Sequence, residues 1–230
     1  MTSRLPAMFY HPCYSELNLA ATHRYPISKY RTLYQRLLAL GIAESAFTVS
    51  SPLSVEVLTQ FHCPSYVKSL QDGSIDAKAM RRIGFPWSEQ LFVRSLCSLG
   101  GTVQTAQAAL TSGVALHLSG GYHHAFFNEG SGFCLFNDLG VAAKSMLLHG
   151  LDKILIIDLD VHQGNGTAEI FSSDERVFTF SLHGKNNYPL KKERSDLDVE
   201  LEDGTYDSYF ANTIAENLYS QCDAEGREFN

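Results

Sequence analysis

Two groups of polar residues in this sequence have the types and the spacing that metal-assisted acid–base chemistry needs. The first lies at Asp158–His162, directly after the apolar run Ile154–Ile157. Residues two apart in an extended segment point to the same side, so the Asp160 carboxylate and the His162 imidazole would converge. Such a pair can bind a divalent metal, most often zinc. Asp158 lies on the same side, further down the strand, where it could orient a neighbouring histidine.

The residues that follow favour this metal interpretation over the alternative, in which Asp and His simply begin a polar loop. Gln163–Gly166 is a tight, glycine-rich turn that leads into a short predicted helix at Thr167–Phe171. Glycines placed immediately after metal-type ligands let the backbone approach a buried site closely.

The second group is a pair of adjacent histidines, His123 and His124, which follows the predicted strand Val114–Leu118. Histidine titrates near neutral pH, so the pair could act as a proton acceptor and its electrostatic partner. Alternatively, these are two loop histidines, one exposed and one capping. Because both polar groups follow strands, they are predicted to lie at one edge of the sheet, where an α/β active site forms.

The elements that must position these groups alternate between strand and helix patterns. Apolar runs predict strands at Ala7–Tyr10, Val114–Leu118, Lys153–Asp158 and Arg176–Leu182. Helical patterns predict helices at Lys29–Leu40, Ser54–Phe61, Pro64–Leu70, Gly101–Leu110, Asn137–His149 and Asp207–Gln221. This alternation predicts an α/β fold with an open, mostly parallel sheet flanked by helices. No linker splits the chain, so residues 1–230 are interpreted as one domain.

Composition narrows the class of protein. The chain of 230 residues has 18 Lys plus Arg against 25 Asp plus Glu, and the net charge of −7 argues against a general nucleic-acid binder. No stretch approaches the ~18 apolar residues of a membrane span, and the N-terminus lacks a signal-peptide core. The five cysteines include no CxxC pair and are interpreted as scattered reduced thiols, not as a cysteine-based zinc site. A soluble, cytoplasmic protein is therefore expected, with oligomerisation left open.

A third segment, Ser131–Asp138, is predicted to be a turn followed by the start of a helix, with Asn137 or Asp138 as its N-cap. On composition alone, Phe133 is interpreted as a core residue. Cys134 is interpreted as a small buried hydrophobic side chain.

Four segments together resemble one known family in their order and spacing: Ser119–Ala125, Ser131–Asp138, Asp158–Gly166 and Phe180–His183. That family is the zinc-dependent histone deacetylases and acetylpolyamine amidohydrolases, which have an arginase-like α/β fold. The runs Gly184–Leu190 and Ser195–Asp198 resemble the smaller bacterial and class IV members. The resemblance covers essentially the whole chain, and it implies hydrolysis of an acetylated amine.

The resemblance implies a role for each matching residue. Asp160 and His162 would be two of the three zinc ligands. His124 would be the general base that activates a zinc-bound water. His123 would be the partner of this base, held by Asp158.

Other matching residues would shape the substrate tunnel and a second cation site. Phe133 and Tyr188 would be the aromatic walls of a narrow tunnel for an acetyl-lysine side chain, with Gly132 beside them. Asn165 would stand behind the base, where many members have Asp, so the pKa of the base would be raised less. A structural monovalent cation, usually K⁺, would be bound by the Ser181 hydroxyl and by the backbone carbonyls of Asp158, Asp160, His162 and Leu182.

The family pattern continues with a third zinc ligand, an aspartate after a later strand, and with a tyrosine that hydrogen-bonds the oxyanion. Neither has a counterpart before Asn230, so the domain is expected to be incomplete at its C-terminus, without its last strands and helices. The first hypothesis is a zinc-dependent amidohydrolase that removes acetyl groups from lysine or a related amine. The alternative is a non-catalytic, truncated deacetylase-like fragment or acyl-lysine binder. A two-metal ureohydrolase is weaker, because the histidine pair and the aromatic residues do not suit a guanidinium substrate.

Overall fold

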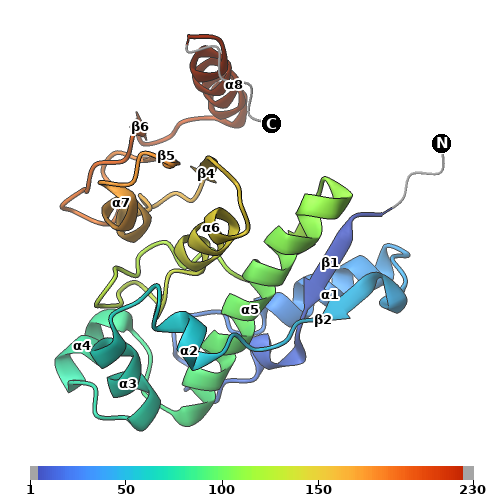
Figure 1. Cartoon of the computed structure of the whole chain (residues 1–230), viewed down its shortest axis with the longest axis vertical. Coiled ribbons are helices and arrows are strands. Elements are labelled where there is room, and N and C mark those ends of the chain that lie inside the picture. The colour runs from blue at the N-terminus through green and yellow to red at the C-terminus, as the bar shows by residue number, and fades with distance from the viewer. Residues whose placement is uncertain (1–4, 225–230) are drawn as a thin grey trace. The chain divides into compact units, whose positions relative to one another are not determined.

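The computed structural model describes residues 5–224, with side chains through Asn217 (Figure 1). The chain forms two compact units, residues 1–151 and 152–230, and each is described by itself. The interpretation of residues 1–230 as one domain, incomplete at its C-terminus, extends beyond the described residues and stays a prediction.

A three-stranded parallel sheet organises the first unit. Its central strand is β1 (Ala7–Tyr10), with β2 (Phe47–Val49) on one side and β3 (Ala115–His117) on the other. The register pairs Phe9 of β1 with His117 of β3. Because β3 ends at His117, the segment that carries the histidine pair leaves from the carboxyl end of this sheet.

The long helix α5 is the central element of this unit (Figure 1). Its N-cap is Ser88, whose hydroxyl oxygen accepts the Leu91 N–H at 3.1 Å. The helix packs against α6, β1 and β3, over a core that includes the fully buried Leu91, Leu99 and Phe136. Each such side chain contributes about 1.5–3 kcal/mol by leaving water. The helices of the unit are α1 (Lys29–Ala39), α2 (Val55–Leu58), α3 (Pro64–Asp72), α4 (Ala77–Ile83), α5 (Glu89–Ser112) and α6 (Asp138–Leu148), with 3-10 turns η1 (Pro12–Ser15) and η2 (Glu44–Ala46).

Two glycines in the middle of α5 allow neighbouring segments to approach the helix closely. A Cβ atom on Gly100 would lie 2.0 Å from the Ser51 carbonyl oxygen, and one on Gly101 would lie 2.2 Å from His117 Nε2. A glycine inside a helix costs about 1 kcal/mol relative to alanine. Tertiary packing therefore overrides helix propensity at this point, and it brings His117 at the end of β3 against α5.

The second unit holds another three-stranded parallel sheet, in which β5 lies between β4 and β6. Its strands are β4 (Ile154–Asp158), β5 (Val177–Gly184) and β6 (Leu197–Leu201). Helix α7 (Asn165–Phe171) connects β4 to β5, and α8 (Asp207–Ala224) follows β6. The register pairs Asp158, the last residue of β4, with Ser181 of the buried strand β5.

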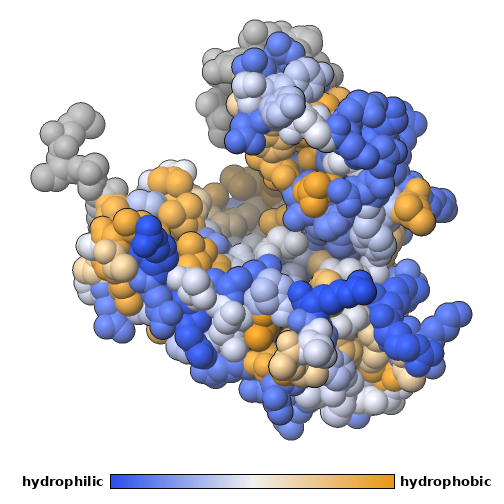
Figure 2. Space-filling view, turned by 180° about the vertical axis from the view of Figure 1, so that it is seen from behind, coloured by the Kyte–Doolittle hydropathy of each residue, from blue (hydrophilic) through white to orange (hydrophobic). Residues whose placement is uncertain are grey.

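The predicted α/β class with parallel strands and flanking helices is confirmed, but the strands form a separate three-stranded sheet in each unit, whereas the sequence predicts a single sheet. Across residues 5–224, no helix is both long and apolar enough to cross a membrane. Figure 2 shows a face of the molecule on which hydrophilic side chains prevail and apolar ones gather in separate patches. Some apolar side chains of the strands stay accessible: Leu116 of β3 is 46% exposed and Ile157 of β4 is 42% exposed.

Candidate active site

The two adjacent histidines lie in the first unit, on a turn that follows β3. His123 and His124 are buried, at 6% and 4% exposure. Their ring centroids are 4.1 Å apart, and the ring planes are tilted by 41°. The alternative of one exposed and one capping loop histidine is therefore wrong, because both imidazoles are held inside the protein.

Asp138, the first residue of α6, fixes the turn that presents the histidines. Its Oδ1 accepts the Tyr122 N–H at 2.7 Å, and its Oδ2 accepts the Gly121 N–H at 3.1 Å. Asn137 is the N-cap of α6, since its side chain accepts the Gly140 N–H at 2.8 Å. Sequence alone does not distinguish these two residues as the N-cap; in the structure Asn137 caps the helix and Asp138 binds the turn.

A buried hydrogen-bonded chain connects Asp138 to the first sheet. The Thr102 hydroxyl lies 2.6 Å from Asp138 Oδ2 and must donate to it, because a carboxylate only accepts. Thr102 Oγ1 therefore accepts from His117 Nδ1, at 3.0 Å. His117 Nε2 then accepts from the Tyr14 hydroxyl, at 2.9 Å. Because burial also lowers the pKa of His117, these bonds indicate a neutral ring with its proton on Nδ1.

A second buried histidine, His62, supports the loop on the other side of the pair. Its Nε2 accepts the Asn137 N–H at 3.0 Å, so Nδ1 carries the proton and donates to the Phe127 carbonyl at 3.1 Å. His62 is only 1% exposed. A protonated ring would present a donor to the Asn137 N–H, so this arrangement also requires a neutral histidine.

Because His62 and His117 are buried in the neutral form, we expect the free energy of unfolding to decrease in mild acid. Burial lowers the pKa of His62 to about 4, and burial lowers that of His117 to about 4 against the opposing effect of Asp138. An unfolded histidine titrates near pH ~6.5, so between about pH 6.5 and pH 4 the unfolded chain binds more protons. The free energy of unfolding should fall as pH drops through this window, by up to ~1.4 kcal/mol per pH unit for each histidine.

Urea unfolding at several pH values between about 7.5 and 4.5 measures this slope, because that range covers most of the window given by the two pKa values. His62→Asn should flatten the slope, since it removes one of the two groups. A free energy of unfolding that stays level from neutral pH down to about pH 5 would contradict the assignment.

Gly132 and Phe133 approach the histidine pair from the loop before α6. Gly132 has φ +54° and Phe133 has φ +66°, so both adopt the left-handed backbone region. A Cβ atom on Gly132 would lie 2.5 Å from His124 Cδ2. The Phe133 N–H donates to the Ile83 carbonyl at 2.7 Å, which holds the loop against the end of α4. The predicted tunnel-wall segment is therefore in direct contact with the predicted general base.

Gly132→Ala is expected to displace His124 and to strain the backbone by about 1–2 kcal/mol. Activity should fall much more than this loss of stability explains, because the added methyl group occupies the space of the imidazole ring. Gly150→Ala is the matched control, since Gly150 has φ +96° and open space around its Cβ position. Denaturation, and an assay of the hydrolysis that the sequence resemblance implies, separate the two effects when both variants are measured; equal activity in both would contradict this prediction.

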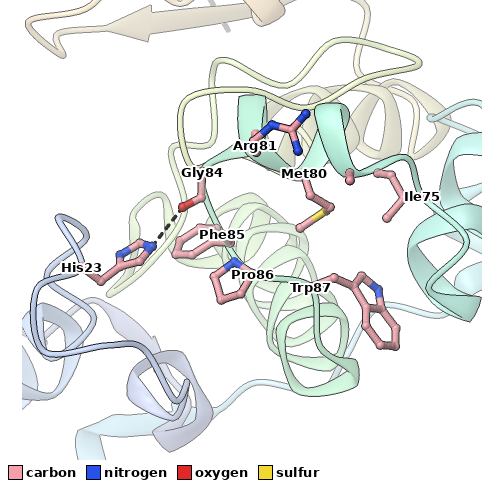
Figure 3. A pocket seen from close by; sticks show the side chains of 9 residues that line it. His23, Ile75, Met80, Arg81, Gly84, Phe85, Pro86 and Trp87 are labelled. Atoms are coloured by element: carbon pink, nitrogen blue, oxygen red, sulfur yellow. Dashed lines mark hydrogen bonds between the residues drawn. The ribbon is translucent and has the colours of Figure 1, made fainter.

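An apolar pocket of about 660 Å³ lies in the same unit (Figure 3), and two of its lining residues, His23 and Phe85, make ring contacts with Phe133. Its wall includes His23, whose Nε2 donates to the Gly84 carbonyl at 3.0 Å and whose ring stacks on Phe85 at 5.6 Å between centroids. Phe85 and Phe133 meet edge to face at 5.4 Å. No sequence signal predicts this pocket, because Trp87 and the other lining residues carry no motif.

The Asp/His group lies in the second unit, directly after β4. His162 Nδ1 and Asp160 Oδ1 are 3.0 Å apart, and their side chains are 39% and 50% exposed. The backbone orders the segment, because the Asp160 N–H donates to Asp158 Oδ1 at 3.0 Å and the His162 N–H donates to Asp160 Oδ1 at 2.8 Å. The two side chains do lie together, but through a bend that follows β4 and not along an extended segment, and their role as metal ligands stays a prediction.

The other predicted residues of this unit surround that segment. The Tyr188 ring meets the His162 ring edge to face, at 6.0 Å between centroids. Asn165 is buried at the first turn of α7. Ser181, which precedes Leu182 on β5, has its hydroxyl 3.4 Å from the Gly164 N–H and 3.0 Å from His183 Nδ1. The monovalent-cation site assigned to Ser181, Leu182 and the three carbonyl groups stays a prediction.

The structure thus brings the predicted residues together in two sets. Gly132 and Phe133 join the histidine pair in the first unit, whereas the second unit holds Asp158, Asp160, His162, Asn165, Ser181, Leu182 and Tyr188. Convergence of the two sets around one metal ion stays a prediction. So does the orientation of His123 by Asp158.

The second set has the kind of donor atoms that zinc binds, but its Asp160 and His162 pair provides fewer ligands than a catalytic zinc site needs. A carboxylate oxygen and an imidazole nitrogen 3.0 Å apart at the carboxyl end of a parallel strand form a donor pair of the kind that zinc takes. A catalytic zinc site keeps three protein ligands. The pair therefore supplies two of the three.

Comparison with known proteins finds one family model and several relatives that match most of this chain. The Histone deacetylase domain matches residues 23–224. An uncharacterized protein of Picosynechococcus sp. is 44% identical over 211 residues, which are 91% of this chain and 70% of that protein. A probable deacetylase of Archaeoglobus fulgidus is 31% identical, over 90% of this chain and 62% of its own length.

Solved structures agree with this. The crystal structure of a histone deacetylase homolog from Aquifex aeolicus superposes with a TM-score of 0.79 at 25% identity, over 94% of this chain and 64% of that one. A histone deacetylase homolog complexed with SAHA gives the same TM-score at 26% identity and the same coverage. The chain therefore spans less than two thirds of the length of these solved relatives.

Proposed function

The chain belongs to the histone deacetylase family, and from this premise we propose that the protein is a zinc-dependent amidohydrolase that removes acetyl or other acyl groups from lysine side chains or related amines. The observation that carries the proposal is the buried pair His123 and His124, set by Asp138 and touched by Gly132. A proton acceptor fixed in this way, next to an aromatic side chain, suits hydrolysis of a neutral amide on an aliphatic stem.

Each residue has a defined part in this proposal. His124 takes a proton from the attacking water on a ring nitrogen and later returns it to the leaving amine. His123, 4.1 Å away between centroids, is its partner. Asp160 and His162 hold the zinc ion, which when bound would polarise the amide carbonyl and lower the pKa of water. Asn165 orients the base without adding charge.

The aromatic side chains would select the substrate. Phe133, held by the Ile83 carbonyl, and Tyr188, beside His162, would enclose the methylene stem of lysine. Acetylation removes the charge of the amine, so the neutral head can enter an apolar passage that a free ammonium would enter at high cost. The K⁺ ion proposed at Ser181 would also bind the backbone carbonyls of Asp158, Asp160 and His162, and it would thereby stabilise the loop after β4.

The test is an acetyl-lysine peptide assay in Zn²⁺, on the protein expressed from its complete reading frame. Acetate release should require zinc and should fall to background in Asp160→Asn and His162→Ala, each with reduced zinc uptake. Asp152→Asn is the control, because Asp152 is an exposed carboxylate just before β4. Turnover that survives chelation of zinc, or that is unaffected by Asp160→Asn, would refute the proposal.

A second candidate is a non-catalytic acyl-lysine binder, favoured because, among the described residues, no third His, Cys, Asp or Glu ligand atom gathers with those of Asp160 and His162. This protein would bind an acetyl-lysine peptide without releasing acetate. Measuring binding and turnover on the same sample separates the two functions.

A further inference from the structure

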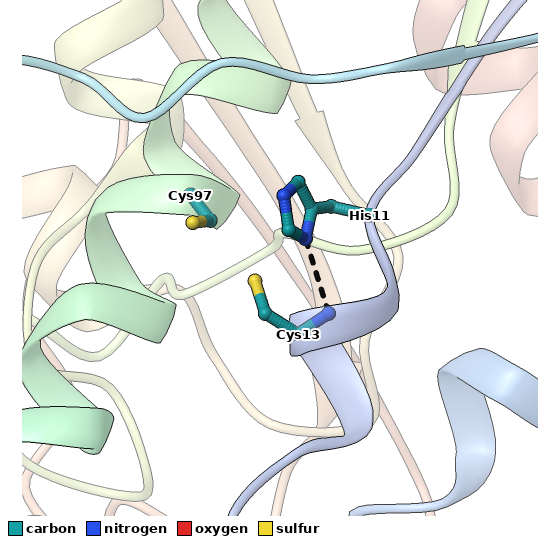
Figure 4. Close-up of side chains that lie close together, drawn as sticks. All are labelled: His11, Cys13 and Cys97. Atoms are coloured by element: carbon teal, nitrogen blue, oxygen red, sulfur yellow. Dashed lines mark hydrogen bonds between the residues drawn. The ribbon is translucent and has the colours of Figure 1, made fainter.

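A group of metal-type side chains lies outside the candidate active site, where η1 meets α5. Among the described residues, His11, Cys13 and Cys97 form the one set of three or more such side chains whose ligand atoms all lie within 4.8 Å of one another. Figure 4 shows the two sulfur atoms and the imidazole ring pointing toward one another. His11 is the N-cap of η1, Cys13 lies in η1 and Cys97 lies in α5.

The donor set has the chemistry of a soft metal site. Two thiolates and an imidazole can serve as three protein ligands of a zinc ion, which leaves the fourth coordination position for water. His11 Nδ1 now accepts the Cys13 N–H at 3.1 Å, so in the neutral ring this nitrogen carries no proton and has a lone pair. A metal ion at that nitrogen would replace one neutral hydrogen bond with a stronger metal–ligand bond.

The surroundings of the cluster favour a thiolate at Cys97. The neighbouring sulfur atom lowers the pKa of Cys97 and raises that of Cys13, whose pKa burial raises further, while the Arg94 guanidinium lowers both. Cys13 would therefore release its proton when a metal binds. Arg94 is 2% exposed and is already engaged, because its Nε donates to the Tyr14 carbonyl at 2.8 Å. Its positive charge therefore stabilises negative sulfur in the cluster. The thiolate is the form that binds metals.

The cluster also has a route from solvent. A cavity of about 460 Å³ is lined by Cys13 and Arg94 and by two carboxylate residues, Glu16 and Glu89. Carboxylates beside the opening would attract a cation toward Cys13. The same cavity has room for the water that would complete four coordination.

We propose that His11, Cys13 and Cys97 form a second metal site, which binds Zn²⁺ or a similar thiophilic ion and fastens η1 to α5. The site is independent of the proposed catalytic metal, whose ligands include no sulfur. A metal ion that binds the folded state but not the unfolded state would raise the thermal midpoint of unfolding as the metal concentration rises.

Titration with Cd²⁺ under reducing, oxygen-free conditions tests this proposal, because thiolate-to-cadmium charge transfer absorbs in the ultraviolet and reports only sulfur ligands. The wild-type chain should show the band at one Cd²⁺ per chain, and Zn²⁺ should displace it. Cys13→Ser and Cys97→Ala should each abolish the band. His11→Ala should weaken affinity by more than the ~10–100-fold typical of losing an outer partner of a metal ligand.

Two control variants distinguish this site from metal binding elsewhere on the chain. Cys63→Ser should keep the band, because Cys63 lies at the start of α3 with its sulfur 3.2 Å from Ser65 Oγ. The double variant Asp160→Asn/His162→Ala should also keep it, which separates this site from the proposed catalytic one. A wild-type chain without the band, or a band that persists in Cys13→Ser, overturns the proposal. If Cys97→Ala does not fold, heat unfolding of Cys13→Ser replaces it: Cd²⁺ should not stabilise that variant, and stabilisation equal to that of the wild type overturns the proposal.

Discussion

Asp138→Ala is expected to lower the free energy of unfolding by about 3 kcal/mol or more and to disorder the turn that holds the histidine pair. The substitution removes the acceptor of the Gly121 and Tyr122 N–H groups and of the Thr102 hydroxyl. Each buried donor left without an acceptor costs about 1–3 kcal/mol. Chemical denaturation measures the loss, and Asp152→Ala, an exposed carboxylate, should change stability by no more than about 0.5 kcal/mol.

Asp138→Asn distinguishes loss of volume from loss of charge. The amide keeps the shape of the side chain, but one of its two ends is a donor and would face either the backbone N–H groups or the Thr102 hydroxyl. We expect an intermediate loss of stability and a reduced catalytic rate in a protein that still folds. If Asp138→Asn is as stable and as active as the wild type, the carboxylate does not position the turn.

His124→Ala is expected to reduce deacetylation by about 10²–10⁴-fold, which is the usual contribution of a positioned general base. The free energy of unfolding should change far less than the rate, because other groups hold the turn. His149→Ala is the matched control, since His149 is an exposed histidine at the end of α6. The measurement is kcat/KM on an acetyl-lysine peptide together with bound zinc.

The metal content decides what this result means. Loss of activity with zinc retained supports a role for His124 in proton transfer. Loss of zinc together with activity would mean that His124 helps to hold the metal, and activity within about tenfold of the wild type would remove it from the mechanism.

The elements that the sequence predicts correctly are those whose signals are local. The four strands expected from apolar runs are confirmed to within two residues, because a buried parallel strand such as β4 has a continuous apolar pattern. The apolar runs do not predict β2 and β6, because Phe47–Val49 is very short and the apolar residues of Leu197–Leu201 are interrupted by acidic ones. These strands form because the sheet offers them a partner, which is information that a single segment does not contain.

The first half of α5 is not predicted, because its helical signal is interrupted by two glycines. The sequence predicts a helix from Gly101, whereas the observed one runs from Glu89 to Ser112. A glycine pair normally favours the end of a helix, and only the close contacts of Gly100 and Gly101 explain why the helix continues through it.

In the candidate site, too, contacts within one short segment could be predicted from the sequence, whereas contacts between distant segments could not. The proximity of Asp160 and His162 could be predicted because the two residues are neighbours in one short segment, although that segment bends after β4 and is not extended as the spacing argument assumes. The function of Asp138 could not, because its partners come from α5 and from the turn after β3. Without a CxxC pair in the sequence, Cys13 and Cys97 are interpreted as scattered thiols, whereas the structure places them with His11. Their contact depends on the packing of η1 against α5.

The glycine pair of α5 has a consequence for anyone who engineers a more heat-resistant version of this protein. Replacing glycine with alanine inside helices is a standard stabilising substitution, and a propensity scale would choose Gly100 and Gly101 first. Here an added methyl group would push Ser51 and His117 outward, so the expected gain becomes a loss. Residues outside the packed face of α5 offer safer targets for such redesign.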